Sequence, residues 1–168
     1  MAISAAVDAS LRVLRVAQKL GVKRVVLTGS IASMMASMKT GTFGPSDWTN
    51  IEAPDVNTQA KSKTLTEKAA WDFINGQEGD APMELTVMAP GVVFGPPLGS
   101  NISGQSLSLM DQILRGKVPM VPNGAFPMVD VRDVRNCMCK HSRYLRQQAN
   151  GLSFQERNQL ASPAWRSS

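Results

Sequence analysis

Between Gln59 and Phe73 the chain reads QAKSKTLTEKAAWDF, an unbroken helical pattern from which the neighbouring elements can be assigned. No proline interrupts it, and its residues fall on two sides at the spacing of an α-helix. One side carries Lys63, Glu67, Ala70 and Ile74, and the other carries Leu65, Ala69 and Phe73. The pattern predicts an amphipathic helix over 59–73, with Ser62 and Lys63 in a first turn where an anion would be stabilised.

Strand-like runs lie on both sides of this helix. Downstream, Leu85–Ala89 is apolar and breaks into the turn sequence PGVVFGPP at 90–97. Upstream, Arg24–Thr28 is a short apolar run typical of a buried parallel strand, and Ser4–Leu20 has a helical pattern that Gly21 ends. Helix, glycine turn and strand form the second half of a βαβ unit, so the sequence predicts an α/β fold with parallel strands.

The other segments predict a loop, a helix and a turn. Ser33–Pro54 contains several Gly and Pro residues and indicates a loop. Ser103–Arg115 predicts a helix, and Asn123-Gly124 predicts a turn ahead of a short strand. The expected buried stripe of that helix is Leu107, Met110 and Leu114.

Length and composition indicate one globular domain. The 168 residues, 43% of them hydrophobic, suffice for a single core. We expect no membrane span, because no long apolar run is present, and no secretory signal, because no basic region precedes an apolar one. Cys137 and Cys139 are too close together for an ordinary disulfide, which indicates a reduced, cytoplasmic chain, and with His141 they give only a weak metal signal.

The net charge of +5 comes entirely from the C-terminal end. Residues 1–131 carry 11 basic and 11 acidic side chains, whereas residues 132–168 carry 7 basic and 2 acidic ones. The basic residues are scattered among Gln, Ser and Asn without a periodic apolar face. We therefore expect neither nucleic acid nor a membrane as a partner.

The helix sequence SKTLTEKAAWDF, followed by LTVMAPGVVFGPPLG, resembles the extended short-chain dehydrogenase/reductase family. The similarity is to its dihydroflavonol-reductase-like, NAD-dependent epimerase/dehydratase type, and it covers roughly residues 2–134. It implies an incomplete NAD(P)-binding Rossmann-type fold, with the N-terminal βαβ half missing and a smaller substrate-side region attached. In such a fold Asp130 or Asp133 would cap the helix that follows.

The resemblance stops after Val134, which divides the chain into residues 1–134 and 135–168. When the codons from Val134 onward are read from their third base, permissible choices give Ala-Glu-Leu-His-Val-Gln-Ala-Leu-Lys-Val-Pro-Glu-Ala-Ala-Gly-Glu-Arg-Phe. This sequence resembles the family segment that is absent here. Our hypothesis is that 135–168 is a frameshifted, basic tail, which should be poorly ordered and carry no evolved site.

The resemblance also implies catalytic residues. The family places a Ser or Thr that hydrogen-bonds the substrate oxygen where Ser30 stands, and a lysine that contacts the nicotinamide ribose where Lys63 stands. Four residues before that lysine the family has a tyrosine that exchanges a proton with the substrate, but here the residue is Gln59, which cannot ionise. Without the resemblance, Ser30 would be interpreted as a strand-end serine that caps the next segment.

The implied cofactor is NADP or NAD, and the implied partner is a small-molecule carbonyl substrate. The residues expected to contact the cofactor are Thr28, Lys63, Pro90, Gly91, Val92 and Val93. The last four lie in the loop that the family places against the nicotinamide. No Gly-x-Gly-x-x-Gly turn is present to hold the pyrophosphate. Binding by this chain alone is therefore not expected to resemble that of a complete enzyme.

Three functions remain open from the sequence. The first is a partial NAD(P)-dependent oxidoreductase that is inactive by itself. The second is a non-catalytic scaffold or dimerising module, because the family's homodimers commonly use the helix that carries Lys63 and its neighbour. The third, a hydrolase with Ser30 and His141, is disfavoured because Gly29 lies one residue before the serine and Ala32 two after, which is not the nucleophile-elbow spacing.

Overall fold

A computed structural model describes residues 2–37, 43–78, 82–97, 99, 104–118, 127–144 and 156–160. Helices and strands alternate through most of this part of the chain, as expected for an α/β protein. In chain order they are α1 (Ala2–Lys19), β1 (Arg24–Thr28), α2 (Ala32–Met35), α3 (Thr58–Asn75), β2 (Glu84–Pro90), β3 (Val92–Phe94), α4 (Gln105–Leu114), β4 (Met128–Asp130), α5 (Val131–Tyr144) and β5 (Glu156–Leu160).

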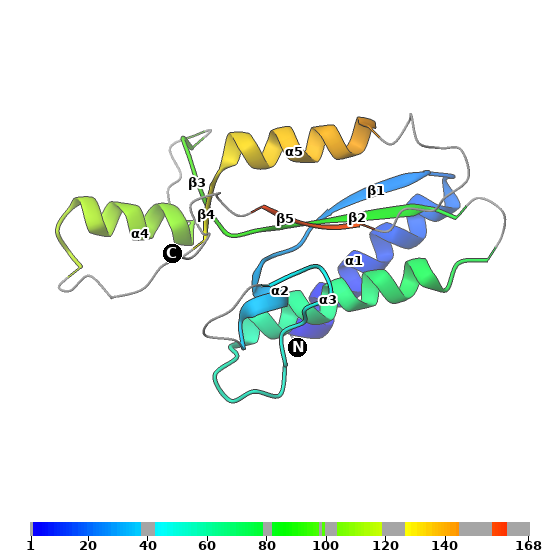
Figure 1. Cartoon of the computed structure of the whole chain (residues 1–168), viewed down its shortest axis with the longest axis horizontal. Coiled ribbons are helices and arrows are strands. Elements are labelled where there is room, and N and C mark those ends of the chain that lie inside the picture. Colours follow the sequence, from blue (N-terminus) through cyan, green and yellow to red (C-terminus); the bar gives the residue numbers. More distant parts are fainter. Residues whose placement is uncertain are drawn as a thin grey trace.

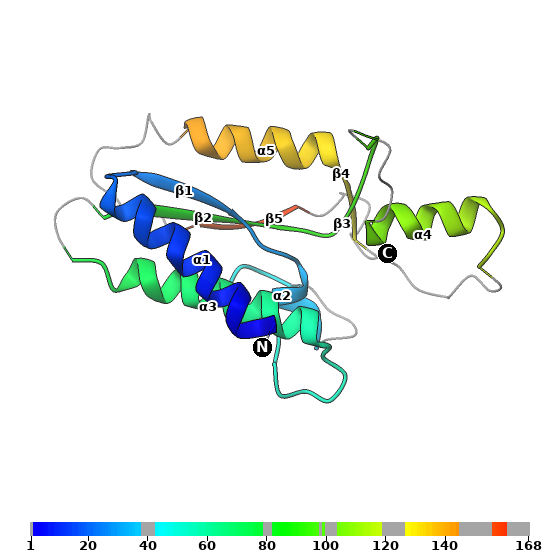
Figure 2. The same ribbon diagram turned by 180° about the vertical axis from the view of Figure 1, so that it is seen from behind.

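The main sheet has three parallel strands in the order β1-β2-β5. Arg24 pairs with Glu84 at the start of β1, and Thr86 pairs with Glu156 at the start of β5. Helices α1 and α3 cover one face of the sheet and α5 covers the other (Figures 1 and 2). A separate parallel pair, β3 and β4, continues from the carboxyl end of β2 and lies beside α4. The predicted α/β fold with parallel strands is confirmed.

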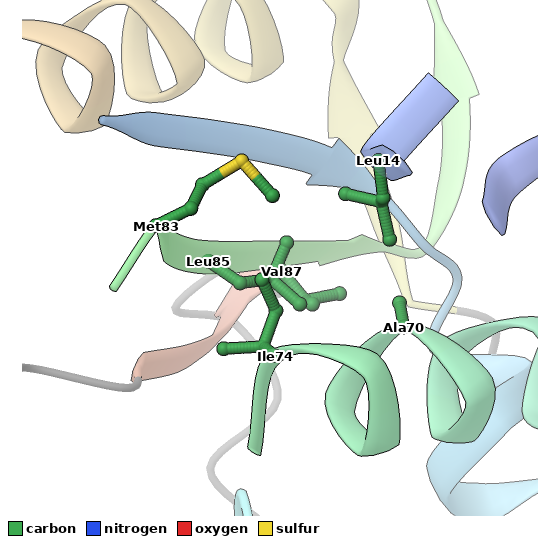
Figure 3. Packing of buried hydrophobic residues seen from close by; sticks show 6 residues of the cluster. All are labelled: Leu14, Ala70, Ile74, Met83, Leu85 and Val87. Carbon is green, nitrogen blue, oxygen red and sulfur yellow. The ribbon is translucent and has the colours of Figure 1, made fainter. Parts of the chain in front are cut away.

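The hydrophobic core lies between the sheet and the two helices α1 and α3 (Figure 3). Leu14 enters it from α1 with 2% of its surface exposed, and Ala70 and Ile74 enter it from α3. The sheet contributes Leu85 and Val87 of β2, which are fully buried. The core thus holds α3 against the sheet, and α3 is the helix that carries Lys63.

The turn between α1 and β1 forms where the sequence predicts it. Gly21 has a left-handed backbone with φ of 70°, and its N–H donates to the carbonyl oxygen of Gln18 at 3.0 Å. Strand β1 has the predicted bounds, Arg24–Thr28. Its residues are only partly buried, in contrast to the prediction of a fully buried strand, because among the described residues it pairs with β2 alone and is an edge strand.

Helix α3 starts earlier than predicted. Asn57 is its N-cap, and its side-chain oxygen accepts a hydrogen bond from the Ala60 N–H at 2.9 Å. Ser62 and Lys63 therefore lie in the second turn, and the expectation that they lie in the first turn was wrong. The side that carries Glu67, Ala70 and Ile74 is the buried one, although Lys63, on the same side, is exposed.

Two further predictions need correction. The segment 33–54, predicted as a loop, begins within α2, whose Ser33 and Met34 are fully buried. Helix α4 has no buried residue, and Leu114 of its predicted buried stripe is 78% exposed. The spacing of apolar residues gives the face of a helix, but burial also needs a partner, and the main contact of α4 among the described elements is with the short strand β3. Asn123-Gly124 lies outside the described residues.

The start of α5 matches the predicted cap. The Asp130 side chain accepts a hydrogen bond from the Arg132 N–H at 2.7 Å. Helix α5 continues to Tyr144, and β5 lies at Glu156–Leu160. The expectation that 135–168 is a poorly ordered tail stays a prediction. The frameshift hypothesis concerns the coding DNA and stays a prediction.

The described residues were compared with the requirements of a disulfide, a metal site and a membrane-spanning helix. Both thiols, Cys137 and Cys139, are free. Within the described ranges, no three His, Cys, Asp or Glu side chains are grouped to hold a metal ion. No helix in this part of the chain is both long and apolar enough to cross a bilayer.

Candidate functional site

The turn after β1 places Ser30 at the carboxyl end of the sheet. The Gly29 N–H donates to the Met88 carbonyl at 2.8 Å, and the Ile31 N–H donates to the Pro90 carbonyl at 3.0 Å. These two hydrogen bonds attach the turn to the end of β2. Carboxyl ends of parallel strands are where α/β proteins bind their ligands, so Ser30 lies at the edge where a substrate is expected.

The hydroxyl of Ser30 also has a local role. Its Oγ accepts a hydrogen bond from the Ala32 N–H at 3.2 Å, at the start of α2. This is the capping role that the sequence left open as an alternative. The two roles are compatible, because a hydroxyl that accepts one hydrogen bond keeps its own hydrogen to donate to a ligand.

A hollow of about 150 Å³ lies between α1, the end of β1 and α3. Its wall is polar on the α3 side, where Lys63 provides a positive charge. It is lined by Ala6, Ser10, Leu27, Thr28, Gly29, Ser62, Lys63, Thr66 and Glu67. The structure thus brings two of the predicted site residues, Thr28 and Lys63, to one hollow, next to the turn that carries Ser30.

Gln59 lies one helical turn before Lys63 on α3 and is exposed, but it does not line this hollow. Thr28 contributes to the hollow, but its hydroxyl donates to Sδ of Met138 at 3.6 Å. Met138 belongs to α5, which covers the opposite face of the sheet, so the Thr28 hydroxyl is used on the side away from α3.

The segment Pro90–Val93 joins the two sheets. Pro90 is buried at the end of β2, and the Val92 N–H donates to the Pro127 carbonyl at 2.8 Å. A Cβ on Gly91 would lie 2.1 Å from that same carbonyl oxygen. The glycine is therefore required by the close approach of Pro127, which is a structural reason separate from any contact with a cofactor.

Charged pairs lie outside the hollow. Asp130 and Arg132 form a bidentate pair with distances of 2.7 and 2.8 Å, and the Arg132 side chain lowers the pKa of Asp130 to about 2. The pair is at the start of α5 and stabilises that junction. Arg132 is exposed and Asp130 is partly exposed, and neither lines the hollow, so the pair gives no reason to assign Asp130 to chemistry.

His141 is far from the arrangement that a hydrolase needs. It lies on α5, where its Nδ1 is 2.9 Å from the Cys137 carbonyl oxygen and 3.6 Å from the Cys137 sulfur. Helix α5 covers the face of the sheet opposite α3 (Figure 2). The ring thus faces its own helix, and this arrangement gives no support to the hydrolase that the spacing around Ser30 already disfavoured.

Sequence reasoning missed two polar groups of the site. Glu67 is 1% exposed and lines the hollow, but the sequence pattern assigned it only to the side of the helix that carries Lys63. The Thr66 hydroxyl oxygen is buried and has no hydrogen-bond partner among the described residues. The position of Glu67, four residues after Lys63, was the available signal, since i and i+4 share a helix face.

The known proteins whose sequences are similar to this chain include several reductases. The chain is 29% identical over 127 residues to the NADPH-dependent methylglyoxal reductase of Saccharomyces cerevisiae, covering 67% of this chain and 37% of that protein. It is 31% identical over 134 residues to cinnamoyl-CoA reductase 2 of Arabidopsis thaliana, covering 77% of this chain and 39% of that protein. No family model matches the chain.

A solved structure is similar as well. The crystal structure of Gre2 from Candida albicans in complex with NADPH matches with a TM-score of 0.67 and 27% identity, covering 94% of this chain and 49% of that one. The chain thus spans about half the length of that structure and less of the two sequence relatives. Its homologues are reductases of the extended short-chain dehydrogenase/reductase family, and its fold is a partial Rossmann fold, as the sequence predicted.

Proposed function

Because its homologues are NADPH-dependent reductases of the extended short-chain dehydrogenase/reductase family, we propose that this chain carries the substrate-side half of a carbonyl reductase. The observation that carries the proposal is the hollow at the carboxyl end of β1, lined by Lys63 and by the residues that precede Ser30. The substrate class is a small carbonyl compound. The whole activity requires the part of the fold that binds the other end of the cofactor.

The residues present fit one end of a dinucleotide. Pockets for drug-sized ligands usually have volumes of about 300–1,000 Å³, and the hollow of about 150 Å³ is smaller. It would suit the nicotinamide ribose, whose hydroxyls Lys63 would hold. Residues 90–93 do not line the hollow, and their assignment to the nicotinamide rests on the family resemblance alone. The sequence has no Gly-rich turn at a helix N-terminus for the pyrophosphate. The choice between NADP and NAD follows the relatives, which use NADPH.

The proposed chemistry assigns a role to each side chain. When bound, the reduced nicotinamide supplies a hydride to the carbonyl carbon. Ser30 donates its hydroxyl hydrogen bond to the carbonyl oxygen and orients it. The oxygen also needs a proton, and Gln59 has none to give at the position of a general acid. We therefore expect no turnover from this chain alone.

The ribose contact can be tested without turnover. Reduced nicotinamide mononucleotide is titrated into the chain, and its fluorescence is followed. Lys63→Met should weaken binding about 10–100-fold, because a hydrogen bond to a charged group contributes about 1.5–3 kcal/mol. Lys61→Met on the same helix is the matched control and should bind like the unmodified chain. Equal binding by both variants would contradict the proposed site.

The DNA decides whether a complete enzyme exists. Reading the coding DNA upstream of Met1 should reveal a strand, a Gly-rich turn and a helix in frame, and a base change after the Val134 codon should restore the family segment. The extended protein is then assayed for NADPH-dependent carbonyl reduction with Gln59 and with Gln59→Tyr. We expect activity only with tyrosine. Activity with Gln59 would contradict the role assigned to this position.

A second candidate function is self-association without catalysis. Helix α1 exposes Val13 and Val16, and the turn directly after it exposes Leu20, with 65%, 55% and 76% of their surfaces accessible. A contiguous exposed apolar face favours an interface, and the helix lies beside α3 as in the family's dimers. Sedimentation should show a homodimer that Val16→Asp dissociates. Leu109→Asp on α4, at a similarly exposed residue, is the control and should leave the dimer intact.

We also propose a cytoplasmic location and neither nucleic acid nor membrane as a partner. The proposal rests on the two adjacent free thiols and on the scattered basic residues of the C-terminal end. Expression of a fluorescent fusion followed by fractionation tests it. Recovery in the membrane or nuclear fraction would contradict it.

A further inference from the structure

Glu67 is a buried carboxyl group close to the proposed catalytic turn. It is 1% exposed on α3, and burial of such a group is costly unless it is hydrogen-bonded. The Ser33 hydroxyl lies 2.5 Å from Glu67 Oε2 and donates to it. Ser33 is itself fully buried, so the contact is shielded from water.

The same serine contacts Ser30. The single hydroxyl hydrogen of Ser33 is shared between Glu67 and the Ser30 carbonyl oxygen, which lies 2.7 Å from Oγ, and the Ser33 N–H donates to that same oxygen at 3.0 Å. The hydroxyl of Ser33 thus lies between the carboxyl group of α3 and the backbone of Ser30. A movement of Glu67 would be transmitted to Ser30 through one side chain.

Gly29 leaves room for the Glu67 carboxyl group beside the backbone of the turn. A Cβ at this position would lie 3.3 Å from Glu67 Oε2 and 3.0 Å from Cγ1 of Val87. The absence of a side chain at Gly29 lets Glu67 pack against the backbone directly before Ser30. Glycine at this site is explained by that approach, because Gly29 has no left-handed backbone.

The far side of the turn is held by Thr49, which is 2% exposed. Its hydroxyl donates to the Ala32 carbonyl at 2.7 Å, and its N–H donates to the Ser33 carbonyl at 2.9 Å. The turn is therefore fixed from the loop on one side and from α3 on the other. Only the α3 side also carries the lysine of the proposed ribose contact.

We propose that Glu67 is a positioning residue: through Ser33 it fixes Ser30 relative to Lys63, one helical turn away on α3. The importance of the position of Ser30 relative to Lys63 rests on the proposed reductase function. The hydrogen bonds that hold Ser30 in place are independent of that function. Glu67 touches no substrate in this proposal and acts only by holding the turn in place.

Amide hydrogen exchange measured by NMR tests the proposal in the intact chain. Glu67→Met keeps the length of the side chain and removes its oxygens, and Ser33→Ala removes the hydroxyl. In each variant the N–H groups of Ala32 and Ser33 should exchange about tenfold faster or more. Glu67→Gln keeps an oxygen that accepts from Ser33 and should restore rates near those of the unmodified chain.

Two controls separate a local effect from general destabilisation. Ile74→Val removes a buried methyl group from the same helix and should raise exchange throughout the chain rather than at the turn. The Arg115 N–H on α4, which donates to Asp111, should be unaffected by Glu67→Met. The double variant of Glu67→Met and Ser33→Ala should exchange like either single variant, because both break one connection.

The outcomes separate the two proposals. Unchanged exchange at Ala32 and Ser33, an equal rise everywhere, or a failure of Glu67→Gln to restore the rates would overturn the positioning role. If Glu67→Met does not fold, Ser33→Ala alone decides by the same criterion. If the exchange results hold but the Lys63 titration fails, the turn is positioned as proposed and the reductase function is wrong.

Discussion

Replacing Leu14 by alanine tests how α1 is held against the sheet. Leu14 has 2% of its surface exposed and contacts the core formed by α3 and β2. The substitution removes three buried carbon atoms, worth about 2.4 kcal/mol in transfer at about 0.8 kcal/mol each, and leaves a cavity that adds to this loss. We expect the free energy of unfolding to fall by about 3 kcal/mol, which corresponds to a thermal midpoint lower by about 6–12 °C.

The matched control is Leu20→Ala, the same substitution directly after the end of α1, where the side chain is 76% exposed. It should change the free energy of unfolding by less than about 0.5 kcal/mol. Both variants are unfolded in urea at low protein concentration, so that self-association through α1 does not contribute. Equal losses for Leu14→Ala and Leu20→Ala would refute the packing of α1 described here. A loss for Leu20→Ala that grows with concentration would instead support the homodimer.

Two further predictions concern helix ends. Asn57→Ala should destabilise the chain by about 1 kcal/mol in urea unfolding, because α3 loses its side-chain N-cap, and an unchanged midpoint would show that the cap contributes nothing. The pKa of Asp130 is lowered from 3.8 to about 2 by Arg132, so its stabilising effect is fully present above about pH 4 and is lost as the pH falls toward 2. Unfolding measured between these pH values should be less pH-dependent in Asp130→Asn, and an identical pH profile in both proteins would contradict the pairing.

The local elements could be predicted where the sequence alone determines them. The bounds of β1 are the predicted ones, because an apolar run follows a glycine turn. Helix α3 was predicted within one residue at its start and two at its end. The missed cap, Asn57, lies just outside the periodic segment that defined the prediction.

The features that could not be predicted depend on contacts between residues that are far apart in the sequence. Glu67 is polar in sequence, and its partner Ser33 is 34 residues away, so neither its burial nor its contact with the Ser30 turn could be inferred. The apolar stripe of α4 was assigned to the core, but burial depends on a neighbouring element that the pattern does not specify. The sequence ERNQL has no apolar run, and nothing in it predicts the strand β5.

The parallel pairing of the main sheet has a consequence for the order of assembly during synthesis. Partners in β1 and β2 are 60 positions apart, and partners in β2 and β5 are 70 apart. The entropic costs of closing these two loops differ by only about 0.1 kcal/mol, so the order is set by which residues leave the ribosome first. At about 5–20 residues per second, β5 follows β2 by about 4–14 s. Throughout that interval the nascent chain presents one open edge of β2, six of whose seven residues are buried once the chain is folded.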